Sequence, residues 1–148
     1  MANVFCGATV LATLFLAACA RTDSIGPGDT LPVGTWGGEG AGLIVEDTIA
    51  HVHINCTFGN FAGPITLDDN RRFNVAGEYV LRTYPVMVGP PQPAQFAGVI
   101  ESNTLTLTVA VNDTTEKKLV ALGPVVVYLG REPNLGPCPI CRKPTAVR

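Results

Sequence analysis

The sequence predicts an all-β fold: a small antiparallel meander barrel of seven or eight strands after an N-terminal signal helix, with a β-sandwich as the alternative. Glycine and proline are frequent, at 16 and 12 residues, and no segment after the N-terminal region combines helical periodicity with helix caps. Short alternating segments instead follow one another through short polar links. We favour the barrel because closing the sheet removes its exposed edges.

The segments expected to form strands are rich in β-branched and aromatic residues and are bounded by Gly, Pro, Asn or Asp. In chain order they cover residues 34–38 continued by 43–45, 51–56, 65–67, 73–81, 96–100, 104–111, 119–122 and 125–129. The first contains the only tryptophan, Trp36. The second alternates strictly, which places Val52, Ile54 and Cys56 on one face and the histidines on the other. Residues 59–64 are expected to return the chain to the third.

The fourth segment starts after the turn sequence Asp68-Asp69-Asn70. A proline-rich stretch, residues 85–93, lacks regular hydrogen-bond donors and is expected to be a loop or a sheet margin. Residues 101–103 and 112–116 are the expected turns on either side of the sixth segment, and Gly123-Pro124 is expected to form a bulge or corner. The inward side chains expected from these segments are Phe73, Val75, Tyr79, Leu81, Phe96, Leu105, Leu107, Val109 and Val111.

The N-terminal region has the character of an export signal. No Asp, Glu, Lys or Arg occurs from Met1 to Ala18, and the apolar run from Val4 to Leu16 is shorter than the about 20 residues that a membrane span needs. We therefore expect residues 1–18 to be a signal peptide that is removed together with Cys6.

The sequence Leu16-Ala17-Ala18-Cys19 resembles the lipobox of bacterial lipoprotein signal peptides. The resemblance implies cleavage before Cys19 and acylation of its thiol, so that the acyl chains attach the protein to a membrane. Because Ala20 and not Asp follows, it further implies the outer membrane in a two-membrane cell. An ordinary secretory signal is the alternative.

The remaining chain divides into three expected parts. Residues 19–33 mix polar residues with Gly and Pro without any period, as a tether does. Residues 34–131 are expected to form the barrel domain and residues 132–148 a C-terminal tail. This length suits one domain.

Two short features resemble lipocalin-like barrels, the calycins. Gly34-Thr35-Trp36 is similar to their Gly-x-Trp, and Arg131 is similar to their late arginine. The resemblance implies that the Arg131 guanidinium packs on the Trp36 ring and closes one end of the barrel, as a cation–π contact. The alternative is a core tryptophan and an unrelated surface arginine. The order of Trp-Gly-Gly, Cys and Gly-Arg also resembles uncharacterised exported bacterial proteins.

Three cysteines remain after Cys6 and Cys19 are set aside. In an exported protein we expect a disulfide from Cys56 to the tail, with Cys138 slightly favoured over Cys141 as the partner. The alternative is a metal site in which the Cys-x-x-Cys pair joins His51 and His53. A redox pair is disfavoured, because no credible helix surrounds these cysteines.

No catalytic residue and no cofactor is expected. The only serines, Ser24 and Ser102, lie outside any nucleophile motif, and Asp68 and Asp69 are explained by turn chemistry. A net charge of −2 without a basic surface disfavours nucleic acid as a partner. We expect a membrane-anchored, non-enzymatic binding or structural module of the cell envelope. An envelope protein or a small apolar ligand is the possible partner, and a carrier of such a ligand is the alternative function.

Overall fold

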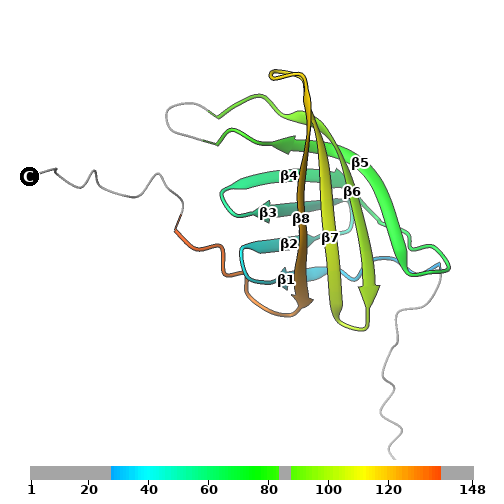
Figure 1. The fold of residues 1–148 in the computed structure, drawn as a ribbon. Helices are drawn as coiled ribbons and strands as arrows, with labels where there is room; N and C mark the ends of the chain where they lie inside the picture. Colours follow the sequence, from blue (N-terminus) through cyan, green and yellow to red (C-terminus); the bar gives the residue numbers. More distant parts are fainter. Residues whose placement is uncertain (1–27, 84–87, 138–148) are drawn as a thin grey trace, which may run out of the picture.

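The computed structural model describes residues 28–83 and 88–137, which form one closed antiparallel barrel with its strands in chain order (Figure 1). The meander barrel is therefore confirmed, and the sandwich alternative is not. Its strands are β1 (Gly34–Gly37), β2 (Ala41–Val45), β3 (Ile49–Ile54), β4 (Thr57–Ala62), β5 (Arg72–Val80), β6 (Gln92–Glu101), β7 (Thr104–Asp113) and β8 (Lys118–Leu129).

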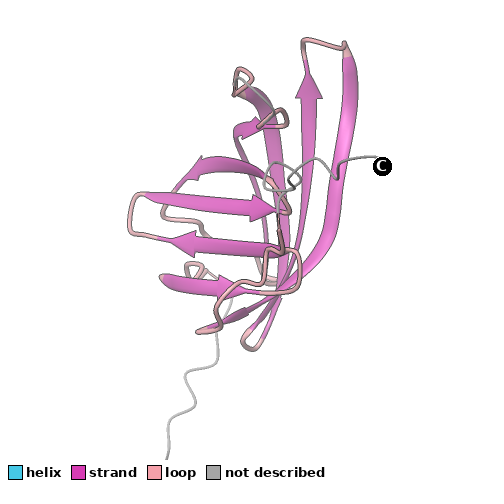
Figure 2. Ribbon diagram, turned by 90° about the vertical axis from the view of Figure 1, so that its left-hand side faces the viewer, coloured by secondary structure: helices cyan, strands magenta, loops and turns pink. Residues whose placement is uncertain are grey.

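The described part of the chain consists of strands and connecting loops (Figure 2). It contains no helix with the length and apolar character of a membrane span. The β7–β8 hairpin extends beyond the other strands at one end of the barrel, as both ribbon views show.

The expected first strand is divided into β1 and β2 by a tight turn. Gly38 N donates to the carbonyl of Ala41 at 2.9 Å, and Gly40 has a φ of +69°. Glycine adopts this left-handed conformation without the steric cost that a side chain brings. The continuous strand expected over residues 34–45 was therefore wrong.

Strand β4 differs from the expectation, because residues 59–64 were expected to form a return. Gly59 is not a turn residue: a Cβ atom there would lie 2.4 Å from Cδ2 of Tyr79, so its small size makes room for the ring. The β3–β4 turn instead contains Asn55, with a φ of +53°, and Cys56. Cys56 therefore does not extend the inner face of β3.

Residues 65–67 do not form the short strand that was expected, but they do contribute to the core. Ile65 and Leu67 are buried, and their backbones bond with the segment that precedes β1: Leu31 N donates to the carbonyl of Ile65, and Leu67 N donates to that of Asp29. Leu31 is itself buried. The folded part thus includes residues 28–33, which were expected to belong to the tether.

The long strands agree with the sequence pattern. Leu105, Leu107, Val109 and Val111 of β7 are all buried, and the alternate threonines face outward. Strand β8 runs through Gly123-Pro124, where its register with β7 shifts between Leu107 and Val109. This shift is the bulge that the glycine and proline predicted.

Aromatic side chains fill the middle of the barrel. The rings of Phe61 and Phe96 stack with centroids 4.5 Å apart. Phe73 packs beside Phe61, and Tyr79 packs beside Phe96, each with ring centroids 6.2 Å apart. A Cβ atom on Gly98 would lie 2.4 Å from Cε1 of Phe73. Most of the side chains expected to face inward are buried. The buried ones are Phe73, Tyr79, Phe96, Leu105, Leu107, Val109 and Val111, and Val75 and Leu81 are partly buried.

The barrel closes where β1 pairs with β8, through Trp36 opposite Leu129 and Gly37 opposite Tyr128. Trp36 is fully buried, and its Nε1 donates to the carbonyl of Pro32 at 3.1 Å. After β8 the chain passes over the β1–β2 turn. There Asn134 N donates to the carbonyl of Gly38, and Gly40 N donates to the carbonyl of Asn134. The beginning of the expected tail is therefore docked on the barrel.

Candidate functional site

The most organised polar group on the outer wall is the histidine pair of β3. Because His51 and His53 alternate with the buried Val52 and Ile54, both rings lie outside the barrel and are half-buried. Their Nε2 atoms are 2.9 Å apart, and the rings meet edge to face with centroids 4.8 Å apart. The expectation that the two histidines share one face is confirmed.

Strand β4 supplies the neighbours of this pair. His51 lies opposite Asn60 in the β3–β4 register, and His53 lies opposite Phe58. The side-chain oxygen of Asn60 is 2.5 Å from Nδ1 of His51, and the Phe58 ring is within 6 Å of both imidazoles, at 5.9 and 5.6 Å between centroids. Sequence reasoning missed Asn60 and Phe58, because it did not recognise β4 as a strand.

Burial lowers the pKa of His53 below its ordinary value of 6.5, and the nearby His51 lowers it further. Both effects disfavour a positive charge on the His53 ring. Neutral imidazole is the form that binds metal ions.

A metal site of three or more protein ligands is not found among the described residues, where no group of three His, Cys, Asp or Glu side chains is suitably placed. The four-ligand site expected as a minority alternative also needs Cys138 and Cys141, which lie outside the described residues. Cys19 lies outside them as well. Cys56 is among the described residues and lies in the β3–β4 turn. Its pairing with Cys138 or Cys141 stays a prediction, because both tail cysteines lie outside the described residues.

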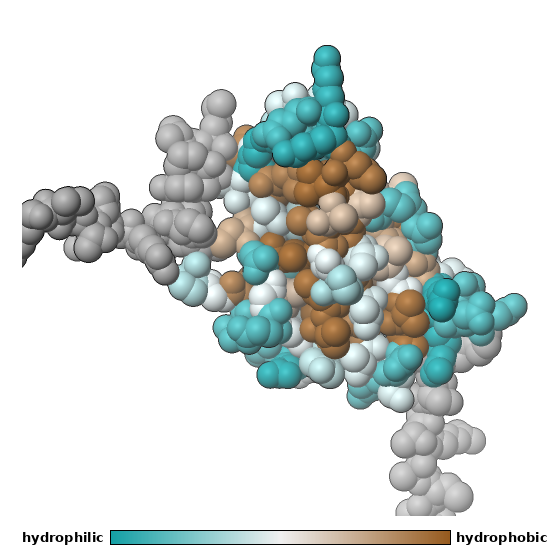
Figure 3. Space-filling model, viewed as in Figure 1, coloured by the Kyte–Doolittle hydropathy of each residue, from teal (hydrophilic) through white to brown (hydrophobic). Residues whose placement is uncertain are grey.

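A second candidate site is a groove of about 670 Å³ on the outer wall of β5, β6 and β7. Its rim is polar, with Arg72, Asn74, Thr106 and Thr108 from the strands and Asp68 from the loop before β5. The other lining residues are Thr66, Leu67, Phe73, Ala97, Gly98 and Val99. Figure 3 shows apolar residues gathered on this side of the molecule, below the polar tip of the β7–β8 hairpin.

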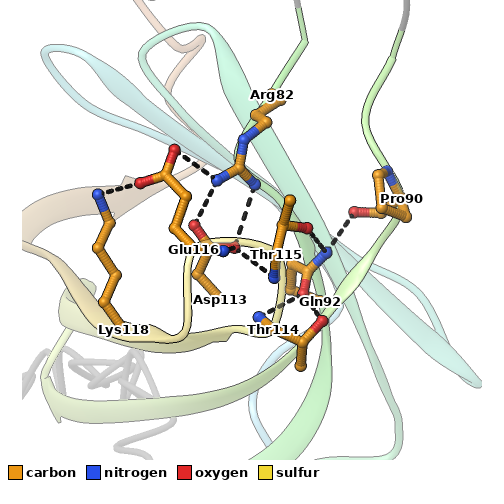
Figure 4. A network of polar contacts seen from close by, with 8 residues as sticks. All are labelled: Arg82, Pro90, Gln92, Asp113, Thr114, Thr115, Glu116 and Lys118. Atoms are coloured by element: carbon orange, nitrogen blue, oxygen red, sulfur yellow. Dashed lines mark hydrogen bonds and ion pairs between the residues drawn. The ribbon is translucent and has the colours of Figure 1, made fainter.

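The most extensive polar network lies at the end of the barrel from which the β7–β8 hairpin projects (Figure 4). Arg82 contacts Asp113 and Glu116, and Glu116 also pairs with Lys118. The hydrogen bonds from Arg82 lower the pKa of Asp113, and Lys118 and then Arg82 lower that of Glu116. Every acidic group here is therefore paired with a cation, which indicates a structural network rather than catalytic acids.

Gln92 connects the same region to the start of β6. Its side-chain oxygen accepts from the backbone N and the hydroxyl of Thr114, at 2.8 and 2.6 Å, and its amide donates to the carbonyl of Pro90 at 3.2 Å. The side chain is 1% exposed, so these bonds satisfy its buried polar atoms. The stretch before β6 is thus fastened to the β7–β8 turn.

Arg131 does not pack on Trp36 as the calycin resemblance implied. Its guanidinium carbon lies 5.5 Å from the ring centroid of Tyr128, on the outside of the barrel, whereas Trp36 is enclosed inside. The physical reason is the alternation along β8: Tyr128 faces solvent next to the exposed Arg131, and Val127 faces the core. Trp36 nevertheless lies in the β1–β8 pairing that closes the barrel.

Comparison of the chain with models of known protein families, with curated proteins and with solved structures found no match.

Proposed function

We propose that the protein is a cell-envelope lipoprotein whose barrel is a non-enzymatic binding module that holds its partner on the outer wall. The observation that carries the binding role is the groove of about 670 Å³ over β5, β6 and β7. A polar rim around apolar lining residues is the usual composition of a binding site. The anchor is supported by the lipobox-like Leu16-Ala17-Ala18-Cys19.

A polypeptide segment of an envelope protein fits this groove better than a purely apolar ligand. Arg72 and Asp68 offer charges of both signs, while Asn74, Thr106 and Thr108 offer amide and hydroxyl groups. Polar groups of this kind around an apolar centre match the hydrogen-bonding groups of a peptide backbone and its side chains.

The carrier alternative has weaker support. A carrier needs a chamber inside the barrel, and at the level of Phe96 the described interior is occupied by stacked rings. Gly77 and Gly98 make room for these rings, because a Cβ atom on either would lie within 3 Å of one of them. The outer wall is therefore the better candidate for binding.

Site-specific photo-crosslinking in the native envelope tests the binding role. A photoreactive residue in place of Thr106 in the groove is expected to capture one envelope protein, and the added substitution Arg72→Glu is expected to reduce this product strongly. The control position is Asp47 in the β2–β3 turn, which does not line the groove. Equal amounts of crosslinked product from both positions, or a product that Arg72→Glu does not reduce, would rule out the groove as the binding site.

The anchor is tested separately by fractionation. Cys19→Ser is expected to move the protein from the membrane to the soluble fraction, because no acyl chain can then be attached. Cys6→Ser is the matched control and is expected to leave the protein in the membrane, since Cys6 belongs to the expected signal peptide. Membrane association that survives Cys19→Ser would overturn the lipoprotein assignment.

A further inference from the structure

We propose that His51 and His53 form a binding site for one divalent copper ion on the outer wall of β3, with each imidazole coordinating through Nε2. The two Nε2 atoms are 2.9 Å apart, although the residues come from one strand. A period of two brings their side chains to the same face, and the pleat sets them side by side. The site is separate from the groove and uses none of its lining residues.

Asn60 prepares His51 for this role. An amide oxygen is only an acceptor, so the 2.5 Å contact with Asn60 Oδ1 places a proton on Nδ1 of His51. In a neutral imidazole the other nitrogen, Nε2, then carries the lone pair that a metal ion needs. Partners of this kind fix the tautomer and orientation of histidine ligands in metal sites.

Without metal, Nε2 of His53 donates its hydrogen to Nε2 of His51, since the latter has only a lone pair to offer. Metal binding requires this proton to move through solvent to Nδ1 of His53, so that Nε2 of His53 also presents a lone pair. The proton only changes nitrogen within the His53 ring, so no net proton is released. A small turn of the rings then aims both lone pairs at one position.

The number and type of the ligands favour copper over zinc. Zinc sites in proteins use three or four protein ligands, whereas two imidazoles with solvent oxygens match the tetragonal nitrogen and oxygen set that Cu²⁺ prefers. Cu²⁺ also stands highest in the order of affinities of divalent first-row metals.

The surroundings complete an open site. Phe58 covers one side of the two imidazoles, and the half-buried rings remain accessible from solvent. No third His, Cys, Asp or Glu side chain joins them among the described residues. Water or a ligand from the medium therefore occupies the remaining positions.

Titration of the full chain in detergent with Cu²⁺ tests the site, followed by calorimetry and by electron paramagnetic resonance. We expect one ion per chain and a spectrum with hyperfine structure from two imidazole nitrogens. Asn60→Ala is expected to lower the affinity by about 10-fold or more, as loss of such a supporting partner does. His51→Gln and His53→Gln are each expected to lower it further, and Zn²⁺ is expected to bind more weakly than Cu²⁺.

Two controls separate this site from other sources of binding. Asn112→Ala removes an exposed amide of β7 that has no part in the histidine pair or in the groove, and it is expected to leave the affinity unchanged. The double variant Cys138→Ser/Cys141→Ser is expected to keep the two-nitrogen spectrum. Circular dichroism checks that every variant is folded. Loss of the spectrum in the cysteine variant, or copper affinity that is unchanged in His51→Gln/His53→Gln, would overturn the proposal.

Discussion

Arg82 donates two hydrogen bonds to the carboxylate of Asp113, from Nη1 to Oδ1 at 3.2 Å and from Nη2 to Oδ2 at 2.5 Å. Arg82 follows β5 and Asp113 ends β7, so the pair joins strands that are not neighbours in the sheet. The Asp113 side chain is 1% exposed. Its other bonds come from the backbone N atoms of Thr115 and Glu116 in the β7–β8 turn.

Replacing Arg82 with Met is expected to destabilise the barrel, because it leaves the enclosed Asp113 carboxylate without its cation. Thermal unfolding followed by circular dichroism measures the effect as a lower midpoint. Lys118→Met is the matched control: it removes the outer ion pair with Glu116, in which both side chains are at least half exposed. Exposed pairs of this kind contribute little, so a shift as large as that of Arg82→Met would contradict the prediction.

The same pair makes stability depend on pH. Arg82 lowers the pKa of Asp113 below its unfolded value, so the folded state binds fewer protons than the unfolded state when the solution is acidic. The stabilisation is present above about pH 4 and is lost as the pH falls through the lower folded value. Urea unfolding at pH 7 and at pH 3 is expected to show a smaller difference between wild type and Asp113→Asn at pH 3. A constant difference would argue against this linkage.

Phe96→Ala is expected to lower the free energy of unfolding by roughly 3–5 kcal/mol, the usual cost of removing a buried phenylalanine ring. The ring contacts both Phe61 and Tyr79, so its loss leaves a cavity in the middle of the core. Urea denaturation measures the change. Val126→Ala, at a residue 40% exposed on β8, is the control and is expected to stay within about 0.5 kcal/mol. A small cost at Phe96 would show that the interior is less closely packed than described.

A disulfide from Cys56 to the tail is expected because both segments bond to the same glycine. Asn55 N donates to the carbonyl of Gly40, and Gly40 N donates to that of Asn134, four residues before Cys138 in the sequence. Mass spectrometry of a digest without reductant is expected to find a Cys56–Cys138 peptide. That peptide should disappear in Cys138→Ser, while Cys141→Ser keeps it. A bridge that is found only in chains retaining Cys141 would assign the alternative partner.

The strand pattern allowed much of the fold to be predicted. Alternation along β7 identified its four core residues, and the Gly123-Pro124 sequence identified the bulge in β8, because both are local consequences of side-chain period and backbone freedom. One error occurred where a glycine had two possible roles. Gly59 was interpreted as a turn residue, but it serves to admit the Tyr79 ring from the neighbouring strand.

The candidate sites were less predictable than the fold. The shared face of His51 and His53 follows from their spacing in the sequence, but the contact with Asn60 depends on the β3–β4 register. Arg131 was assigned to Trp36 by resemblance, and the geometry pairs it with Tyr128.

By itself, the sequence determined the all-β class, the meander order and most of the inward side chains, because these depend on short-range alternation and turn chemistry. Only the tertiary structure decided which side chains meet across strands, such as Arg82 with Asp113, 31 residues away. The physical reason is that strand register and barrel closure come from contacts between distant segments, and a shift of one residue would exchange the inner and outer faces.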